Sequence, residues 1–252
     1  MIKITFYAVC ALLLTFLIYM SLAPMVEIRQ TSRHIQMDSV PRKQLPSEVS
    51  ALNRELTFKQ ALLELSQEDS IGLIVNLNDS TIGISIHGVV LHSTKTNSLH
   101  IDPWLTRLPD ALYLDKFSRP VTISSHRSTI IKEPIVVREA PKDPLEAAVN
   151  AYQPDTLIQN PAFLQFDMET NVRLLIEQDM TTTWLDRKTR FAFFNALYMG
   201  NLKVNLKHFF TWRGPAYTPE IRMALPADDM RAIYRALPSK TSVVIYLNRA
   251  ST

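Results

Sequence analysis

The chain opens with an almost continuous apolar run. Residues 4–23 are apolar apart from two threonines and one serine. A helix of about 20 residues is about 30 Å long, which matches the hydrocarbon core of a bilayer. The run therefore predicts an N-terminal transmembrane helix, either a retained anchor or a secretory signal. Retention is favoured because Pro24 directly follows the Ser-Leu-Ala tripeptide at which a signal would be cleaved.

The side of the membrane is not decided by charge, because basic residues flank the run at both ends. Long domains cross membranes largely regardless of charge, and an N-terminal apolar stretch is the usual export device. We therefore expect a membrane-anchored protein whose domain is extracytoplasmic, in the periplasm of the cell envelope. The absence of cysteine after Cys10 fits an oxidising compartment.

The polar pattern that follows predicts a tether over residues 26–45. Apolar residues then recur at helical spacing and predict one amphipathic helix over 47–66. These patterns divide the chain into an anchor at 1–25, a tether with an amphipathic helix at 26–70, and a folded domain at 71–252.

From residue 71 the pattern changes to short β-rich or alternating runs separated by turn residues. The runs predict strands at 71–77, 81–93, 121–125, 130–138, 162–168, 172–178, 220–225 and 241–247. Helical spacing predicts short helices within 103–117, 145–152, 184–198 and 227–237, whereas 202–212 partly alternates again. Several strands with few helices predict a mainly β domain, either a β-sandwich or a partly closed barrel with peripheral helices.

The composition excludes several classes of function. Hydrophobic residues make up 46 % and charged residues 20 %, which is enough for a sizeable core. The five glycines form no phosphate-binding loop, and the net charge of +3 is too small to indicate nucleic acid. A single cysteine excludes internal disulfides and thiolate zinc clusters, and the six histidines lack metal-site spacing. We expect no cofactor, no metal and no nucleic-acid partner.

Both ends of the domain resemble a known enzyme family. Residues 217–223 read Tyr-Thr-Pro-Glu-Ile-Arg-Met and precede an acidic helix start and a final Val-Val-Ile strand. This resembles the end of the L,D-transpeptidase catalytic domain, where Ser-His-Gly-Cys-Ile-Arg-Met stands in the same place. Residues 74–89 resemble the first hairpin of that domain. The resemblance implies an L,D-transpeptidase-like fold over about 71–248.

The same resemblance implies that the catalytic site is degenerate. The nucleophilic cysteine of the family falls on Glu220, its glycine on Pro219 and its histidine on Thr218. Acyl transfer of this kind needs a thiolate activated by a histidine and donors for the oxyanion. A carboxylate is a poor substitute, and Pro219 also lacks a backbone N–H. We therefore expect no catalytic residue at these positions and a chain that is not an enzyme.

The leading hypothesis is a membrane-anchored, catalytically inactive L,D-transpeptidase-like protein that binds or scaffolds in the cell envelope. Its expected partners are the membrane, through residues 4–23, and either peptidoglycan stem peptides or an envelope protein. Arg222 is retained from the motif and is expected to meet a carboxylate, while Trp212 and Tyr217 line the groove. In the competing interpretation, Arg222 pairs locally and the two aromatic residues belong to the core.

Two other functions remain open at this stage. The first is an enzyme with a rebuilt site, in which Glu220 and His208 act as acid and base in a hydrolytic reaction. The second is an unrelated membrane-tethered interaction module, in which the helix at 47–66 docks a partner.

Overall fold

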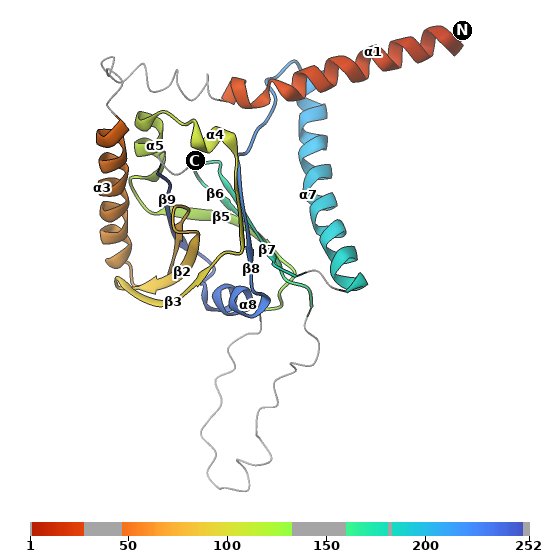
Figure 1. Cartoon of the computed structure of the whole chain (residues 1–252). Helices are drawn as coiled ribbons and strands as arrows, with labels where there is room; N and C mark the ends of the chain where they lie inside the picture. The colour runs from red at the N-terminus through yellow and green to blue at the C-terminus, as the bar shows by residue number, and fades with distance from the viewer. Residues whose placement is uncertain (1, 28–46, 133–159, 181–182, 249–252) are drawn as a thin grey trace, which may run out of the picture.

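The computed structural model describes residues 2–27, 47–132, 160–180 and 183–248. Nine strands form one sheet in these residues (Figure 1). They are β1 (Gly72–Asn76), β2 (Thr81–Ile86), β3 (Val89–Lys95), β4 (Ser98–Ile101), β5 (Val121–Ser128), β6 (Phe163–Met168), β7 (Arg173–Gln178), β8 (Glu220–Leu225) and β9 (Ser242–Tyr246). The helices are α1 (Ile2–Ser21), α3 (Ser47–Ser66), α4 (Pro103–Thr106), α5 (Asp110–Phe117), α7 (Trp184–Phe210) and α8 (Ala227–Ala236).

Several predicted segments can be compared with these elements. The helix predicted at 47–66 is α3, and the strands predicted at 71–77 and 220–225 contain β1 and β8. Most of the predicted tether at 26–45, the predicted helix at 145–152, and the predicted strand at 130–138 beyond residue 132 lie outside the described residues.

The strands follow the order β3-β2-β1-β9-β5-β6-β7-β8-β4. β1 pairs with β9 and β7 with β8 in parallel, and the other neighbours are antiparallel. The two outermost strands, β3 and β4, are consecutive in the chain. Thr96 N donates to Ser80 O at 2.8 Å and Asn97 N to Ala224 O at 2.9 Å, so this corner is bonded to both ends of the sheet.

The predicted mainly β sandwich or barrel is wrong, because the fold is mixed α/β, with a nine-stranded sheet and 45 % helix. The largest error in helix content falls at residues 202–212. The partial alternation there predicts no helix, yet α7 continues through 27 residues to Phe210. Leu202 and Leu206 are four residues apart, so the same pattern also fits one face of a helix.

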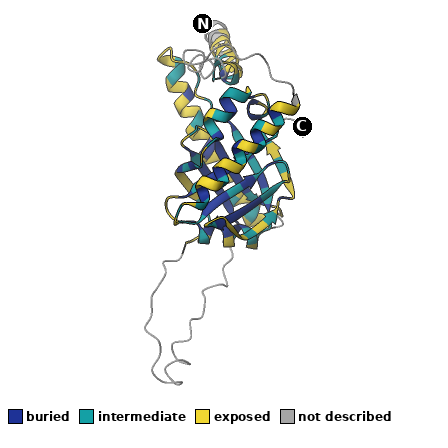
Figure 2. Cartoon of the chain, turned by 90° about the vertical axis from the view of Figure 1, so that its left-hand side faces the viewer, coloured by how far each residue is buried: buried dark blue, intermediate teal, exposed yellow. Residues whose placement is uncertain are grey.

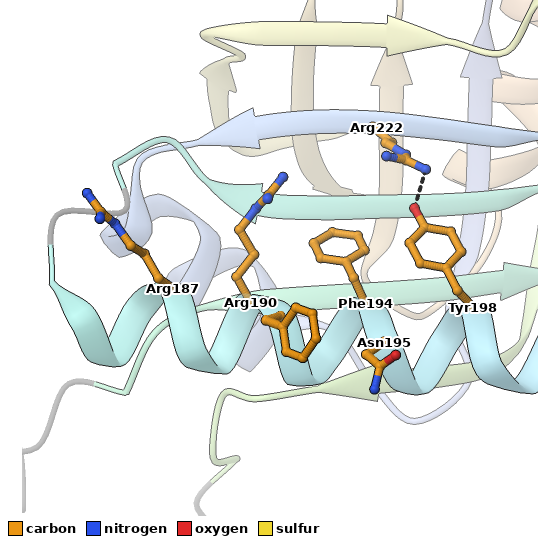
Figure 3. A pocket seen from close by; sticks show the side chains of 7 residues that line it. Arg187, Arg190, Phe194, Asn195, Tyr198 and Arg222 are labelled. Atoms are coloured by element: carbon orange, nitrogen blue, oxygen red, sulfur yellow. Dashed lines mark hydrogen bonds between the residues drawn. The ribbon is translucent and has the colours of Figure 1, made fainter.

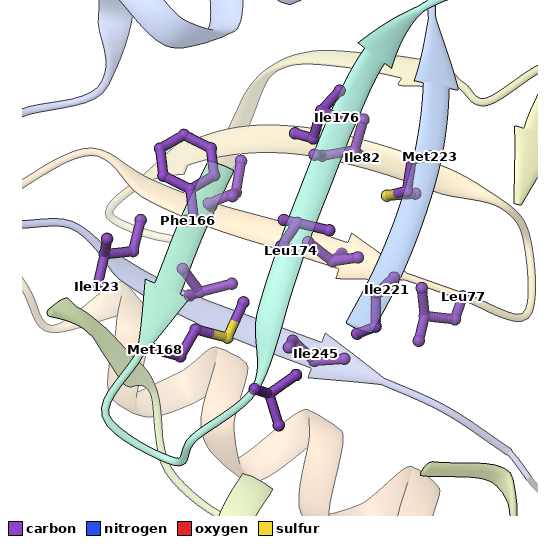
Figure 4. Packing of buried hydrophobic residues seen from close by; sticks show 14 of the residues in the cluster. Leu77, Ile82, Ile123, Phe166, Met168, Leu174, Ile176, Ile221, Met223 and Ile245 are labelled. Carbon is purple, nitrogen blue, oxygen red and sulfur yellow. The ribbon is translucent and has the colours of Figure 1, made fainter. Parts of the chain in front are cut away.

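The inner face of the curved sheet carries the main hydrophobic core (Figure 4). Alternate residues of the strands point into it, among them Leu174 and Ile176 of β7 and Ile221 and Met223 of β8. α4, α5 and α8 add further core residues: Trp104, Leu105, Leu112, Tyr113, Phe117, Met230, Ile233 and Tyr234. The opposite side chains of the same strands are consequently left for the outer face.

Two long helices lie on the outer side of the sheet. α3 packs Ala61 and Leu65 against Val244 of β9, and the ring of Phe58 stacks on Tyr246 at 4.6 Å. Figure 2, viewed from the side where α3 lies in Figure 1, shows mostly buried strands beneath the helices. α7 stands beside β7 and β8, at the other half of the sheet.

The apolar N-terminal run forms α1, but the prediction of a transmembrane anchor at 1–25 is contradicted. Among the residues that the structure describes, no helix has both the length and the apolar character needed to cross a bilayer. The membrane anchoring predicted through residues 4–23, and the extracytoplasmic location inferred from it, lose their basis with this finding. The end of α1 instead packs against α7, where the rings of Phe16 and Tyr19 lie 5.4 and 5.3 Å from that of Phe209.

Candidate functional site

The outer face of β5 to β8 carries charged residues in one row across the strands. The strand register places Ser125 opposite Asp167, Asp167 opposite Arg173, and Arg173 beside Glu220. Because side chains alternate along a strand, residues two positions apart share a face, so Arg222 lies on the same face as Glu220. Glu220 therefore lies in a row of alternating charges.

Glu220 is tightly bound by Arg222. Nε and Nη2 of Arg222 donate to Oε2 of Glu220 at 3.2 and 2.7 Å, and Nη2 also donates to Tyr198 Oη at 2.5 Å. Burial lowers the pKa of the Arg222 guanidinium, but the hydrogen bonds and charges of Glu220 and Tyr198 outweigh it. The pKa of Arg222 therefore lies above its ordinary value, and the side chain remains cationic.

The row continues across the sheet through Arg173. Its Nε donates to Asp167 Oδ1 at 2.6 Å, and its Nη1 lies 3.6 Å from Glu220 Oε1. Gln165 Nε2 and Ser125 Oγ donate to the second oxygen of Asp167, at 2.8 and 3.0 Å. Arg173 is 8 % exposed, so this guanidinium is held by carboxylates and not by water.

α7 forms the wall opposite this row. A capping box starts the helix, with Thr183 and Asp186 bonded to each other's backbone N–H. Phe193 anchors the helix against Phe163 of β6, with the ring centroids 5.8 Å apart. The face of α7 that looks at β8 carries residues at helical spacing, namely Arg187, Arg190, Phe194 and Tyr198 (Figure 3).

Two pockets adjoin Arg222, and we call their union the Arg222 groove. The larger, of about 470 Å³, is lined by Arg187, Arg190, Phe191, Phe194, Asn195, Tyr198 and Arg222. The smaller, of about 340 Å³, is lined by Ser98, His100, Glu177, Arg222, Met223 and Ala224. Arg222 is common to both pockets, and these volumes fall in the range of small-ligand sites.

The larger pocket combines positive charge with aromatic surface. Three arginines line it, and the Arg190 guanidinium is also bonded to Glu177 at 2.7 Å. The Cζ atoms of Arg190 and Arg222 lie 5.2 and 5.9 Å from the ring centroid of Phe194. Such a pocket suits an anionic group that is attached to an apolar body.

The three degenerate-site positions have structural contacts. Thr218 Oγ1 lies 3.4 Å from Asn171 Oδ1, and the carbonyl of the buried Pro219 accepts from Arg173 N at 2.9 Å. The Glu220 side chain is 16 % exposed and lies between two guanidiniums. Both oxygens of the Glu220 carboxylate are therefore occupied by arginines and are not freely accessible.

Tyr217 and Trp212 do not join Arg222 in a groove. Tyr217 packs against the main core, and its hydroxyl donates to Asp102, which caps α4. Burial, followed by the hydrogen bond and charge of Asp102, raises the pKa of Tyr217 well above its ordinary range. Trp212 is 96 % exposed in the segment after α7. One of the two aromatic residues is therefore a core residue, and the other is a surface residue.

His208 and Glu220 are not brought together as an acid–base pair. His208 lies near the end of α7, where its Nδ1 is 3.1 Å from the carbonyl oxygen of Gly214. Both Glu220 oxygens face arginines instead. Within the described part of the chain, no three His, Cys, Asp or Glu side chains form a group that could hold a metal ion.

Sequence reasoning found Arg222 but missed the side chains that surround it. Tyr198 lies 24 residues earlier, and Arg173 and Asp167 belong to a separate hairpin. The usable signal was the spacing of Arg187, Arg190, Phe194 and Tyr198, which places a polar and aromatic stripe on one face of α7.

Comparisons with known proteins identify no relative. No protein-family model, no curated protein and no solved structure matches this chain.

Proposed function

We propose that this chain is a non-catalytic binding module, and that it binds a peptide with a free carboxylate in the Arg222 groove. The observation that carries the proposal is the position of Arg222 at the junction of two pockets, with Nε and Nη2 bonded to Glu220. Its Nη1 makes none of the hydrogen bonds found among the described residues.

The shape and chemistry of the groove support a peptide ligand. A guanidinium recognises a carboxylate through paired N–H donors, and aromatic walls bury apolar side chains. Phe194 and Tyr198 supply such walls beside Arg222. Of the carboxylate-bearing peptides, we favour the peptidoglycan stem peptide, because the resemblance at residues 217–223 is to a domain that acts on it.

The state of Glu220 supports a binding role over a hydrolytic one. A general base needs an oxygen free to reach a substrate or a water molecule. Glu220 is instead engaged by Arg222 and flanked by Arg173, and His208 is bonded elsewhere. The single cysteine of the sequence, Cys10, belongs to α1 and not to the domain.

Isothermal titration of the full chain tests this proposal. A peptidoglycan stem tetrapeptide is compared with the same peptide amidated at its C-terminus. We expect the free acid to bind at least about tenfold more tightly, because the amide cannot form a charge-assisted bond. Arg222→Gln should abolish this preference, whereas Arg119→Gln, an exposed arginine outside the groove, should retain it.

Mass spectrometry of the same mixtures tests the absence of catalysis. The peptide should be recovered unchanged after long incubation. A hydrolysed or cross-linked product that disappears in Glu220→Gln would overturn the proposal in favour of a rebuilt enzyme. Equal affinity for the acid and the amide would show that the protein does not recognise the carboxylate of the peptide.

A further inference from the structure

The carboxylate of Glu220 occupies the part of Arg222 that a ligand carboxylate would use. Guanidinium and carboxylate groups pair best when two N–H donors point the same way, as Nε and Nη2 do here. Both atoms donate to Oε2 of Glu220, at 3.2 and 2.7 Å. An arriving carboxylate therefore meets an arginine whose paired donors are already filled.

The other oxygen of Glu220 faces an arginine nitrogen that lacks a hydrogen bond, Nη1 of Arg173. Oε1 lies 3.6 Å from Arg173 Nη1, which is within ion-pair range and too long for a hydrogen bond. That Nη1 atom is fully buried and has no hydrogen-bond partner among the described residues. Buried donors are nearly always satisfied in folded proteins, so this exception calls for a partner.

We infer that Glu220 is an internal substitute for the ligand and that the ligand displaces it. The carboxylate of the peptide takes the Nε and Nη2 donors of Arg222, and Glu220 turns away and hydrogen-bonds Arg173 Nη1. Glu220 and Arg222 each have a charged partner both before and after the ligand binds. The inference rests on the proposed function, since it requires a carboxylate ligand at Arg222.

Two features of the row make such an exchange feasible. Arg173 is held from its other side by Asp167 at 2.6 Å, so it stays in place while Glu220 moves. Glu220 and Arg173 are also neighbours in the parallel register of β7 and β8, so the side chain of Glu220 needs only a rotamer change. A neutral ligand group cannot replace Glu220, because it offers no charge to Arg222.

The test compares Glu220→Gln with wild type, using the stem tetrapeptide and its amide as probes. The glutamine keeps the size of the side chain but competes weakly for Arg222. We expect it to tighten binding of the free acid about tenfold and to change binding of the amide by less than about twofold. Glu169→Gln removes the same charge at the exposed turn between β6 and β7. It should tighten binding of neither the free acid nor the amide.

A double-mutant cycle reports on Arg173 separately from folding. Arg173→Lys in the wild-type background removes the Nη1 donor that receives Glu220, and should weaken binding of the free acid several-fold. In the Glu220→Gln background the same change should have no effect. Equal effects in the two backgrounds would show that Arg173 acts only on the fold and would overturn the exchange.

The outcomes separate the two proposals. If Arg222→Gln abolishes the preference for the acid but Glu220→Gln weakens or does not alter binding, the exchange is wrong and the proposed function stands. If Arg222→Gln has no effect, the proposed function fails and the exchange fails with it.

Discussion

Asn205 of α7 and Ala216 of the segment that follows it are joined by two hydrogen bonds. Asn205 Nδ2 donates to Ala216 O at 3.2 Å, and Ala216 N donates to Asn205 Oδ1 at 2.8 Å. Asn205 is 3 % exposed. The pair fixes how the chain returns from the end of α7 to β8, and hence how α7 is placed beside Glu220 and Arg222.

Replacing Asn205 should therefore destabilise the protein. Asn205→Ala leaves a backbone donor and acceptor of Ala216 without partners, and we expect a loss of about 2–3 kcal/mol in the free energy of unfolding. Urea denaturation measures it. Asn195→Ala, an exposed asparagine on the same helix, should cost no more than about 0.5 kcal/mol. Equal losses in the two variants would contradict the role of the pair.

The buried ion pair of Arg54 and Asp110 joins α3 to α5. Nε and Nη2 of Arg54 donate to Asp110 Oδ1 at 2.9 and 2.7 Å, and Arg54 is 0 % exposed. Asp110→Ala leaves the buried charge of Arg54 without its carboxylate and should lower the free energy of unfolding by about 3–5 kcal/mol. Arg54→Met leaves only the partly exposed Asp110 and should cost less.

Chemical denaturation of the two variants measures this difference. Breaking the exposed pair of Lys59 and Glu55 by Glu55→Ala should change stability by at most about 0.5 kcal/mol. A larger loss for Arg54→Met than for Asp110→Ala would mean that the packing of the arginine, and not its charge, holds α3 in place.

Tyr113 predicts a loss of stability at alkaline pH. Burial, opposed by the hydrogen bond from Leu247 N and the charge of Arg54, raises its pKa from 10.0 to about 12. A phenol whose pKa is raised in the folded state stabilises the fold below pH 10, and this contribution disappears as the pH rises through about 12. It amounts to about 3 kcal/mol at neutral pH.

Tyr113→Phe isolates this contribution from other groups that titrate in the same range. The stability of wild type relative to the variant should be greatest below pH 10 and should fall between pH 10 and 12. Urea midpoints at several pH values measure it. A difference that stays constant over this window would show that the phenol does not titrate with a raised pKa.

Local signals in the sequence accounted for most of the strands near both ends of the domain. Turn residues at 78–80 and 169–171 separate pairs of strands that are neighbours in the sheet, so short-range patterns were sufficient there. The order of the sheet was not accessible in this way. β4 pairs with β8, more than a hundred residues away, and no local pattern encodes that contact.

The candidate site shows the same division. Glu220 and Arg222 were predicted from a short motif, and they lie together because they are two residues apart on one strand. Their partners Tyr198 and Arg173 depend on how α7 and the β6–β7 hairpin pack, which the sequence does not specify locally. Trp212 lies on the exposed segment after α7 and lines a separate pocket there with Tyr19 and Phe209, so it does not join Arg222.

The hydroxyl of Tyr198 tests how Arg222 is oriented. Its oxygen accepts from Arg222 Nη2, and Tyr198 is 42 % exposed at the groove wall. Tyr198→Phe removes one hydrogen bond and keeps the wall. We expect binding of the stem tetrapeptide to weaken about threefold to tenfold, with unchanged thermal stability. Phe191→Leu alters the wall without changing a contact of Arg222. It should weaken binding of the free acid and of the amide equally.

Gly200 lies in the interior of α7, where a glycine weakens a helix. A Cβ atom added there would meet nothing within 4 Å, and the backbone is not in the left-handed region. Gly200→Ala should therefore raise the free energy of unfolding by about 0.5–1 kcal/mol, because alanine favours the helix and loses less entropy on folding. The melting temperature should rise by about 1–4 °C.

Gly83 of β2 is a glycine at which alanine should destabilise the protein. A Cβ atom there would lie 2.7 Å from the backbone oxygen of His92, so β3 would have to move. Gly83→Ala should lower the melting temperature in the scans that show a rise for Gly200→Ala. A fall in both variants would contradict a continuous helix through residue 200. Without that continuity, Tyr198 and Asn205 would not be held on one rigid element, and the wall of the Arg222 groove would not be fixed to the segment that leads into β8.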